Sequence, residues 1–252
     1  MHDPWALYDR LIAGIPAQLT VEDYGVGCAW TYVQVRETGA MGVALTVRQR
    51  AGRPEDSCPI VGQSLRAAAE LVKSWHFIEA SIGAAALNAW YNSPGRLRGL
   101  GLLTTDMAGE KAESFSAFGR ELAGKKVAVI GHFPQLEKKL APICQLSILE
   151  REPQNGDYPD SACEYILPQQ DYSFITGMTL TNKTLPRLLE LCRPGKVCLV
   201  GPSAPLTDIL FDFGVDCISG FCGTEQAQLR EALRRGVKQG VFRGGTMLNY
   251  IR

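Results

Sequence analysis

KKVAVIGHFP, residues 125–134, is a short apolar run that ends in a glycine turn. Such a run is typical of a buried parallel strand that leads into a helix. Two more units of this kind follow, DYSFITG at 171–177 and KVCLVGPS at 196–203, and each precedes a helical pattern. Strand, glycine turn and helix in repetition predict an open α/β sheet, and ligands bind such sheets at the carboxyl ends of their strands.

The preceding part of the chain, residues 1–95, predicts a small α+β domain. Apolar residues at helical spacing start it, and β-branched and aromatic residues in partial alternation then predict an antiparallel meander. The Ala-rich stretch FIEASIGAAALNAWY predicts a closely packed helix that ends at turn formers. The expected elements are a helix at 4–14, strands at 21–26, 28–36 and 42–48, and helices at 64–75 and 77–91.

The rest of the chain is expected to be a connector, 96–124, with a helical piece at 112–122, and an α/β domain, 125–252. Five strands and their helices alternate in this second domain, and its last residues predict an edge strand or a cap. The strands are expected at 127–130, 146–149, 173–176, 197–200 and 216–221, the helices at 136–140, 185–192, 206–213 and 225–236, a short segment at 162–167, and the tail at 242–252.

Composition and charge narrow the classes of function. The 26 Lys and Arg residues balance 26 Asp and Glu residues, so no basic surface for nucleic acid or an anionic membrane is expected. No signal peptide and no apolar run of ~18 residues, the length of a spanning helix, are seen. The eight cysteines are then expected to be reduced thiols. We expect a cytoplasmic protein whose partner is a small molecule.

The first glycine turn of the second domain does not carry a full dinucleotide fingerprint. Gly131 allows a tight turn, and the N–H groups of the following residues can face an anion or a ribose. A G-x-G-x-x-G motif would need glycines where Phe133 and Leu136 stand. Glu150 ends the second strand 19 residues after Gly131, where doubly wound folds place the carboxylate that binds ribose hydroxyls. A solvated Glu at a strand end is the alternative.

His132 is the best acid–base candidate among three histidines. A His at the mouth of a parallel sheet titrates near neutral pH and can ligate a metal, although it can also be a turn residue bonded to backbone. No CxxC or HExxH motif occurs. Cys222, at the end of the fifth strand, could join His132 in space, but a lone Cys is more often part of a core.

The strand-to-helix junction at 176–184, TGMTLTNKT, is dense in small polar side chains. Thr184 suits the N-cap of the following helix, with Pro186 in its first turn. Capping does not explain Thr176, Thr179, Asn182 and Lys183, which suit a carboxylate or phosphate. The next junction, Gly201-Pro202-Ser203, has a capping serine but no G-x-S-x-G elbow, so a serine nucleophile is not expected.

Read together, VIGHFP, ITGMTLTNKTL and GPSAPLTDILFDFGVD resemble the proteins catalogued as a "putative heavy-metal chelation" family. The resemblance covers nearly the whole chain. It implies an enolase N-terminal-like domain followed by a Rossmann-like, doubly wound domain. It also implies a site between the two domains, partly similar to the nucleotide sites of methyltransferases. The implied roles are condensation or hydrolysis in the synthesis of pterin-, flavin- or siderophore-like chelators.

The resemblance is carried over to this chain residue by residue. From the first domain, the helix with Ser81, Gly83 and Asn88 is implied to face the crevice, although Asn88 would equally suit a hydrogen bond within the core. From the second domain, the matching ligand-binding residues are Gly131, His132, Phe133, Glu150, Thr176, Gly177, Thr179, Asn182, Lys183, Gly201, Pro202 and Ser203.

Three hypotheses of function remain open at this point. The first is a small-molecule enzyme with His132 as general acid or base and the 176–183 loop holding an anionic group. The second is a carrier of a metal or chelate without chemistry. The third is a methyltransferase-like enzyme that binds S-adenosylmethionine with Glu150. The expected cofactor is a divalent metal or a nucleoside-containing ligand, and a symmetric homodimer is the base-rate expectation.

Overall fold

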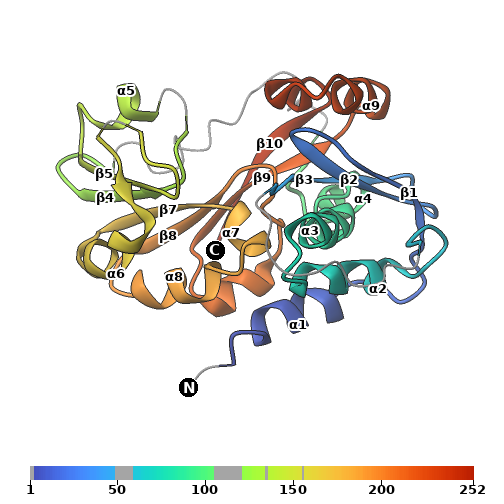
Figure 1. Cartoon of the computed structure of the whole chain (residues 1–252), viewed down its shortest axis with the longest axis horizontal. Helices are drawn as coiled ribbons and strands as arrows, with labels where there is room; N and C mark the ends of the chain where they lie inside the picture. Colours follow the sequence, from blue (N-terminus) through green and yellow to red (C-terminus); the bar gives the residue numbers. More distant parts are fainter. Residues whose placement is uncertain (1–2, 49–58, 105–120, 134–135, 155) are drawn as a thin grey trace.

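The computed structural model of the chain contains two sheets that lie side by side (Figure 1). It describes residues 3–48, 59–104, 121–133, 136–154 and 156–252. One sheet has three strands in the order β1-β2-β3, and the other has seven in the order β10-β9-β8-β7-β4-β5-β6. The predicted fold class, an antiparallel meander with helices followed by a doubly wound sheet, is confirmed.

The first domain is built around the helix α3, Phe77–Tyr91, which is buried along nearly its whole length. Its alanines let it approach the meander closely, and β3 contacts it at Gly42, where any side chain would collide with the backbone of Ala89. The other elements are α1 Ala6–Ala13, β1 Val21–Val26, β2 Trp30–Val35, β3 Met41–Leu45, α2 Leu65–Glu70, the 3₁₀ turn η1 Leu71–Lys73, and α4 Pro94–Gly99.

The seven-stranded sheet is parallel except for its last strand. β10 pairs antiparallel with β9, so the predicted tail is an edge strand. The strands are β4 Lys126–Ile130, β5 Gln145–Glu150, β6 Tyr158–Pro159, β7 Tyr172–Thr176, β8 Lys196–Val200, β9 Cys217–Gly223 and β10 Gly245–Ile251. The helices are α5 Leu136–Leu140, α6 Cys163–Ile166, α7 Met178–Thr181, α8 Leu185–Leu191 and α9 Gln226–Arg235, with 3₁₀ turns η4 Asp160–Ala162, η5 Leu167–Gln169, η6 Asp208–Phe213 and η7 Lys238–Arg243.

Several expected elements differ from the observed ones. The helix expected at 206–213 is the 3₁₀ turn η6, because Thr207 caps it through Ile209 N and Gly214 ends it in the left-handed region. The stretch 64–75 divides into α2 and η1. β6, α4 and α7 were not predicted, because each is too short to show a period. Most of the helical piece expected at 112–122 falls outside the described residues.

The two domains share one hydrophobic core, which includes residues of α1, α3, β7 and β8. Polar contacts cross the same boundary. The side chain of Asn92 donates to Ala204 O at 3.0 Å and accepts from Leu206 N at 2.7 Å. The Tyr8 hydroxyl donates to Leu180 O at 3.0 Å. The boundaries of the two predicted domains remain a prediction, but the two sheets pack as one body. None of the described helices is both long and apolar enough to cross a membrane.

The contact between α3 and β3 leads to a stability prediction. We expect Gly42→Ala to lower the free energy of unfolding by about 1–3 kcal/mol, because the new methyl group overpacks a buried backbone contact. Gly95→Ala is the matched control, since a side chain there would meet no atom within 4 Å. It should leave stability unchanged or raise it by about 0.5–1 kcal/mol. Urea unfolding of the two variants measures both values, and equal losses would contradict this packing.

Candidate functional site

A cavity of about 490 Å³ lies at the carboxyl ends of the central strands. The strand order reverses direction between β4 and β7, and open α/β sheets bind their ligands in the crevice at such a switch point. Ile130 and Gly131 at the end of β4, Glu150 at the end of β5 and Thr176 at the end of β7 all line this cavity. We call it the switch-point cavity.

Gly131 makes the turn at the end of β4 possible. Its φ of 101° lies in the region that only glycine adopts freely. A side chain here would also come within 3.2 Å of the Thr176 side chain and 3.5 Å of the Phe133 ring. The turn therefore keeps the carboxyl ends of β4 and β7 close together.

Glu150 has a fixed orientation beside this turn. Its Oε2 accepts a hydrogen bond of 2.8 Å from the backbone N–H of His132, and its Oε1 accepts one of 2.7 Å from that of Arg151. A carboxylate has about four acceptor positions, so two of them remain for a ligand. Glu150 thus closes the first glycine loop and also presents acceptors to the cavity.

His132 pairs with a carboxylate that the sequence analysis did not single out. Its Nδ1 lies 3.1 Å from Oδ2 of Asp157, whose side chain is fully buried and also accepts from Gln154 N at 3.0 Å. Nε2 has no hydrogen-bond partner among the described residues. An imidazole held at Nδ1 by a carboxylate can use Nε2 to transfer a proton or to ligate a metal.

Several polar side chains of the junction between β7 and α8 form hydrogen bonds with one another or with its backbone. Thr179 Oγ1 donates to Thr176 O at 2.7 Å. Asn182 Oδ1 accepts from both the N–H and the hydroxyl of Thr184, at 3.1 and 2.6 Å. Thr184 holds the predicted N-cap position of α8 but makes no capping bond of its own. Thr176, Thr179, Asn182 and Lys183 all line the switch-point cavity.

Lys183 directs its amine toward the first domain. Nζ donates to Ser74 O and, at 2.9 Å, to Thr181 O, and it lies 5.6 Å and 5.2 Å from the ring centroids of Trp75 and Phe77. Among the described residues it is the one non-glycine residue with a positive φ, 66°. Surroundings that hold a backbone in this region are common at functional sites. Burial lowers the pKa of the amine to about 8.

Charged residues around the cavity are largely paired with one another. Arg151 lies 3.6 Å from Asp160, and Arg187 lies 2.6 Å from Glu164. Sequence reasoning missed these residues together with Asp157. Arg151 and Asp157 lie in REPQNGDYP, residues 151–159, and its density of charged and turn-forming residues was the available signal for those two. Apolar residues complete the lining, namely Ile130, Leu149, Met178, Leu188 and Leu191.

His132 and the remaining candidates lie outside the cavity lining. Ser203 Oγ accepts from Leu45 N at 2.9 Å, and Asn88 Nδ2 donates to Val43 O and Pro202 O at 2.8 and 3.2 Å. A side chain at Gly177 would collide with Ala204. The contacts of Ser203 and Asn88 join the two domains, whereas Gly177 packs on Ala204 within the second domain. Likewise, Phe133 packs against the second core cluster, Ser81 bonds to Val47 and Phe77, Gly83 packs on Val72, and Gly201 turns with a positive φ.

All the residues that line the switch-point cavity lie between 130 and 191. They thus belong to the second sheet and its connections. The first domain contacts one lining residue, Lys183, through the carbonyl of Ser74 and the rings of Trp75 and Phe77.

Cys222 does not lie near His132. Cys222 is fully buried on β9, which is separated from β4 by β8 and β7, or roughly 14 Å at the usual strand spacing. Cys163 lines the cavity, and burial raises the pKa of its thiol to about 12. Within the ranges that the structure describes, no three His, Cys, Asp or Glu side chains are placed to hold a metal ion together.

Two family models match the chain, and both are described as "Putative heavy-metal chelation". One covers residues 8–91 and the other residues 115–252. A crystal structure of a protein with unknown function from Desulfitobacterium hafniense DCB-2 is 38% identical, with a TM-score of 0.90 over 98% of each chain. A second, from Pyrococcus horikoshii, is 21% identical with a TM-score of 0.80 over 98% of each chain, which shows the fold alone. An uncharacterized protein of Methanocaldococcus jannaschii is 26% identical over 79% of this chain and 77% of its own.

The environment of Lys183 predicts a pH dependence. The pKa of its amine falls from 10.5 to about 8 on folding, so the unfolded chain binds the proton more tightly between these values. The destabilising contribution of Lys183 is present below pH 8 and disappears as the pH rises to about 10.5. We expect the stability of the wild type relative to Lys183→Met to increase over that interval in urea unfolding. The exposed Lys238→Met variant should show no such trend, and a flat difference for Lys183→Met would contradict the assignment.

Proposed function

The chain belongs to the family described as "putative heavy-metal chelation", and on that premise we propose that it binds a nucleoside-bearing small molecule in the switch-point cavity. The family description concerns metal-related binding. We infer the kind of organic ligand from the residues of the cavity. The observation that carries it is the anchored carboxylate of Glu150 at the mouth of a cavity at the switch point.

Glu150 has the position and the chemistry of a ribose ligand. It ends the strand next to β4, where doubly wound folds place the acidic residue that accepts hydrogen bonds from ribose hydroxyls. Two backbone N–H groups fix its carboxylate before any ligand arrives, which reduces the cost of ordering it. Arg151 lies 3.6 Å from Asp160, and Arg187 lies 2.6 Å from Glu164 and 3.0 Å from Glu190.

The rest of the cavity suits the base of a nucleoside. Leu149, Met178, Leu188 and Leu191 supply an apolar surface, and Thr176 and Asn182 add polar atoms. Small-molecule sites commonly combine a mainly apolar lining with a few fixed polar groups. A volume of about 490 Å³ lies within the usual range of about 300–1,000 Å³ for such sites. A methyltransferase-like protein that binds S-adenosylmethionine is one member of this class of function.

Metal handling through His132 is the second candidate function, and the His132–Asp157 pair favours it. Metal-bound histidines usually donate their other ring N–H to a carboxylate, which fixes the tautomer. In this pair Asp157 would hold Nδ1–H, and Nε2 would face the metal or the proton of a bound ligand. The described residues supply no third ligand, so a metal would have to arrive with donor atoms of its own, as a chelate does.

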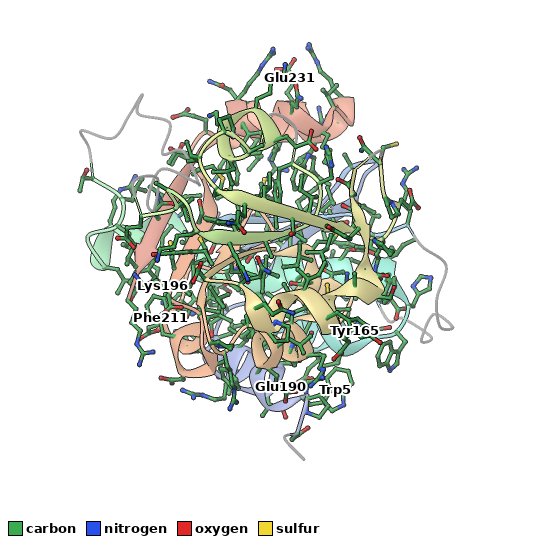
Figure 2. The ribbon with its side chains drawn as sticks, turned by 90° about the vertical axis from the view of Figure 1, so that its left-hand side faces the viewer. Trp5, Tyr165, Glu190, Lys196, Phe211 and Glu231 are labelled. Atoms are coloured by element: carbon green, nitrogen blue, oxygen red, sulfur yellow. The ribbon has the colours of Figure 1, made fainter. Side chains whose placement is uncertain are left out.

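The nucleoside proposal is tested by calorimetry with adenosine and with a dideoxy analogue that lacks both ribose hydroxyls. We expect the wild type to bind adenosine, and Glu150→Gln to weaken binding about 10- to 100-fold, because a hydrogen bond to a charged acceptor is lost. The dideoxy analogue should bind both proteins weakly and equally. Glu231→Gln is the matched control, because Glu231 lies on α9, at the top of Figure 2, and does not line the cavity. Equal adenosine affinity in wild type and Glu150→Gln would contradict the proposal.

The metal candidate requires a separate titration of metal-stripped protein with Ni²⁺ and Zn²⁺, alone and with a small chelator. Loss of His132 should weaken binding of the metal or chelate by about 10-fold or more, as removal of a ligand or its support usually does. His76→Ala is the control, because His76 lies in the first domain at the start of α3. If His132→Ala and His76→Ala change the affinity alike, His132 is not the metal-binding group.

A further inference from the structure

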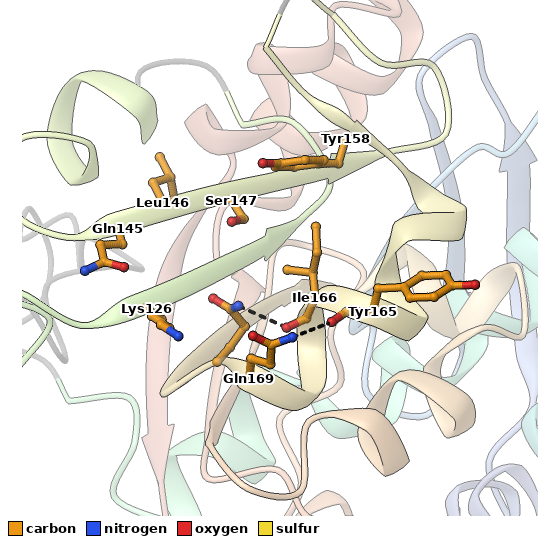
Figure 3. A pocket seen from close by; sticks show the side chains of 9 residues that line it. Lys126, Gln145, Leu146, Ser147, Tyr158, Tyr165, Ile166 and Gln169 are labelled. Carbon is orange, nitrogen blue, oxygen red and sulfur yellow. Dashed lines mark hydrogen bonds between the residues drawn. The ribbon is translucent and has the colours of Figure 1, made fainter.

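A second cavity, of about 300 Å³, lies on the same face of the large sheet near the amino ends of β4 and β5 (Figure 3). We propose that it is a separate binding site for a polyhydroxylated ring the size of one sugar. The segment 158–170 separates it from the switch-point cavity, since residues 160, 161, 163 and 164 line that cavity and residues 158, 165, 166, 169 and 170 line this one. The proposal is independent of the function proposed above.

The sheet face in this cavity is polar where a parallel sheet is usually apolar. Gln145, Ser147 and Leu149 lie on one face of β5, since side chains alternate along a strand. Leu149 belongs to the main core, whereas Leu146 on the opposite face packs against the second core cluster. Ser147 is in register with Ala128 of β4, which also belongs to that core. Faces of parallel strands that are covered by helices usually carry near-continuous apolar residues. The edge of this sheet therefore exposes hydrogen-bonding groups at a place where packing alone would favour apolar ones.

Gln170 supplies a buried acceptor that the protein leaves unused. The residue is 9% exposed and lines the cavity. Its Nε2 donates to Ile166 O at 3.0 Å, whereas Oε1 has no partner among the described residues. Turning the amide over would leave the NH₂ group unpaired instead, so one end of the amide needs a partner in either orientation. A ligand hydroxyl can donate to this oxygen.

The other polar groups in the cavity supply donors. The amine of Lys126, the hydroxyl of Ser147 and the hydroxyl of Tyr158 line it, and no carboxylate does. A hydroxyl group both donates and accepts, so a ring with several hydroxyls can satisfy the orphan acceptor and these donors at once. A purely apolar ligand would leave all of them unpaired, which is costly for binding.

One aromatic ring lies beside these groups. Tyr158 is 47% exposed and pairs with Leu149 of β5, and in Figure 3 its hydroxyl points along β5 toward Leu146. The ring of Tyr165 points away from the cavity in the same view, so this residue contributes its backbone. A single ring on one side suits the apolar face of a sugar, whereas a flat heterocycle would gain from rings on both sides.

The two tyrosines provide a matched test by NMR titration of the full chain with D-glucose, D-galactose and myo-inositol. We expect at least one of these probes to shift the side-chain amide signals of Gln170 and Gln145. Tyr158→Ala and Gln170→Met should each weaken that binding by about 10-fold or more, because each removes a main contact. Tyr165→Ala should leave it unchanged. Glu150→Gln should also leave it unchanged, which separates this site from the switch-point cavity.

Three results would overturn the proposal. The first is the absence of amide shifts with every probe, which would mean that Gln170 is satisfied by water only. The second is an equal loss of binding in Tyr158→Ala and Tyr165→Ala, which would place the ring contact elsewhere. The third is unchanged binding in Gln170→Met. Gln170→Met removes the unpaired oxygen but also the hydrogen bond from Nε2 to Ile166 O, so these two effects on stability oppose each other. We expect only a small change in melting temperature, which thermal unfolding measures.

Discussion

The attachment of the first domain to the loop after β8 is the constraint on which the site depends. Asn92 bonds both a carbonyl and an N–H of this loop, and Asn88 bonds the carbonyl of Pro202. Ser203 completes the contact by accepting from Leu45 N. The carboxyl end of β8 is thus covered by α3 and β3. The carboxyl ends of β4, β5 and β7 are left to form the switch-point cavity.

This division explains why similar glycine junctions have different roles. The loops after β4 and β7 line a cavity, whereas the loop after β8 is used for domain packing. Lys183 connects the two regions, since it lines the switch-point cavity and its amine contacts Ser74 and Phe77 of the first domain. A change in the packing of the domains would therefore shift Lys183, which lines the cavity and has a positive φ.

Much of the architecture could be predicted because its signals are local. The apolar runs that end in Gly131, Gly177 and Gly201 predict the parallel strands, and the Ala-rich run predicts α3 to the residue. The position of Glu150 followed from a rule about strand ends. The partners of these residues could not be predicted in the same way. Asp157 meets His132 only through the path of a turn-rich loop, which has no period that a sequence shows.

Residues with the same local pattern also acquired different surroundings. Asn88 on the Ala-rich helix and Asn182 in the polar junction were both candidates for ligand binding, yet Asn88 joins the domains and Asn182 orients Thr184. The role of each asparagine depends on long-range packing. For Asn88 it depends on the packing of α3 against the loop after β8, which Asn92, directly after α3, also contacts. The polar face of β5 is a similar case, because Gln145 and Ser147 line a cavity only together with residues of the segment 158–170.

The most direct measurement is a crystal structure of the protein soaked with adenosine. If Glu150 binds a ribose, ligand density will lie in the switch-point cavity, with both ribose hydroxyls within hydrogen-bonding distance, about 2.5–3.0 Å, of the Glu150 carboxylate. Density for the ribose elsewhere on the chain, or an ordered cavity that holds only solvent at saturating adenosine, would contradict it.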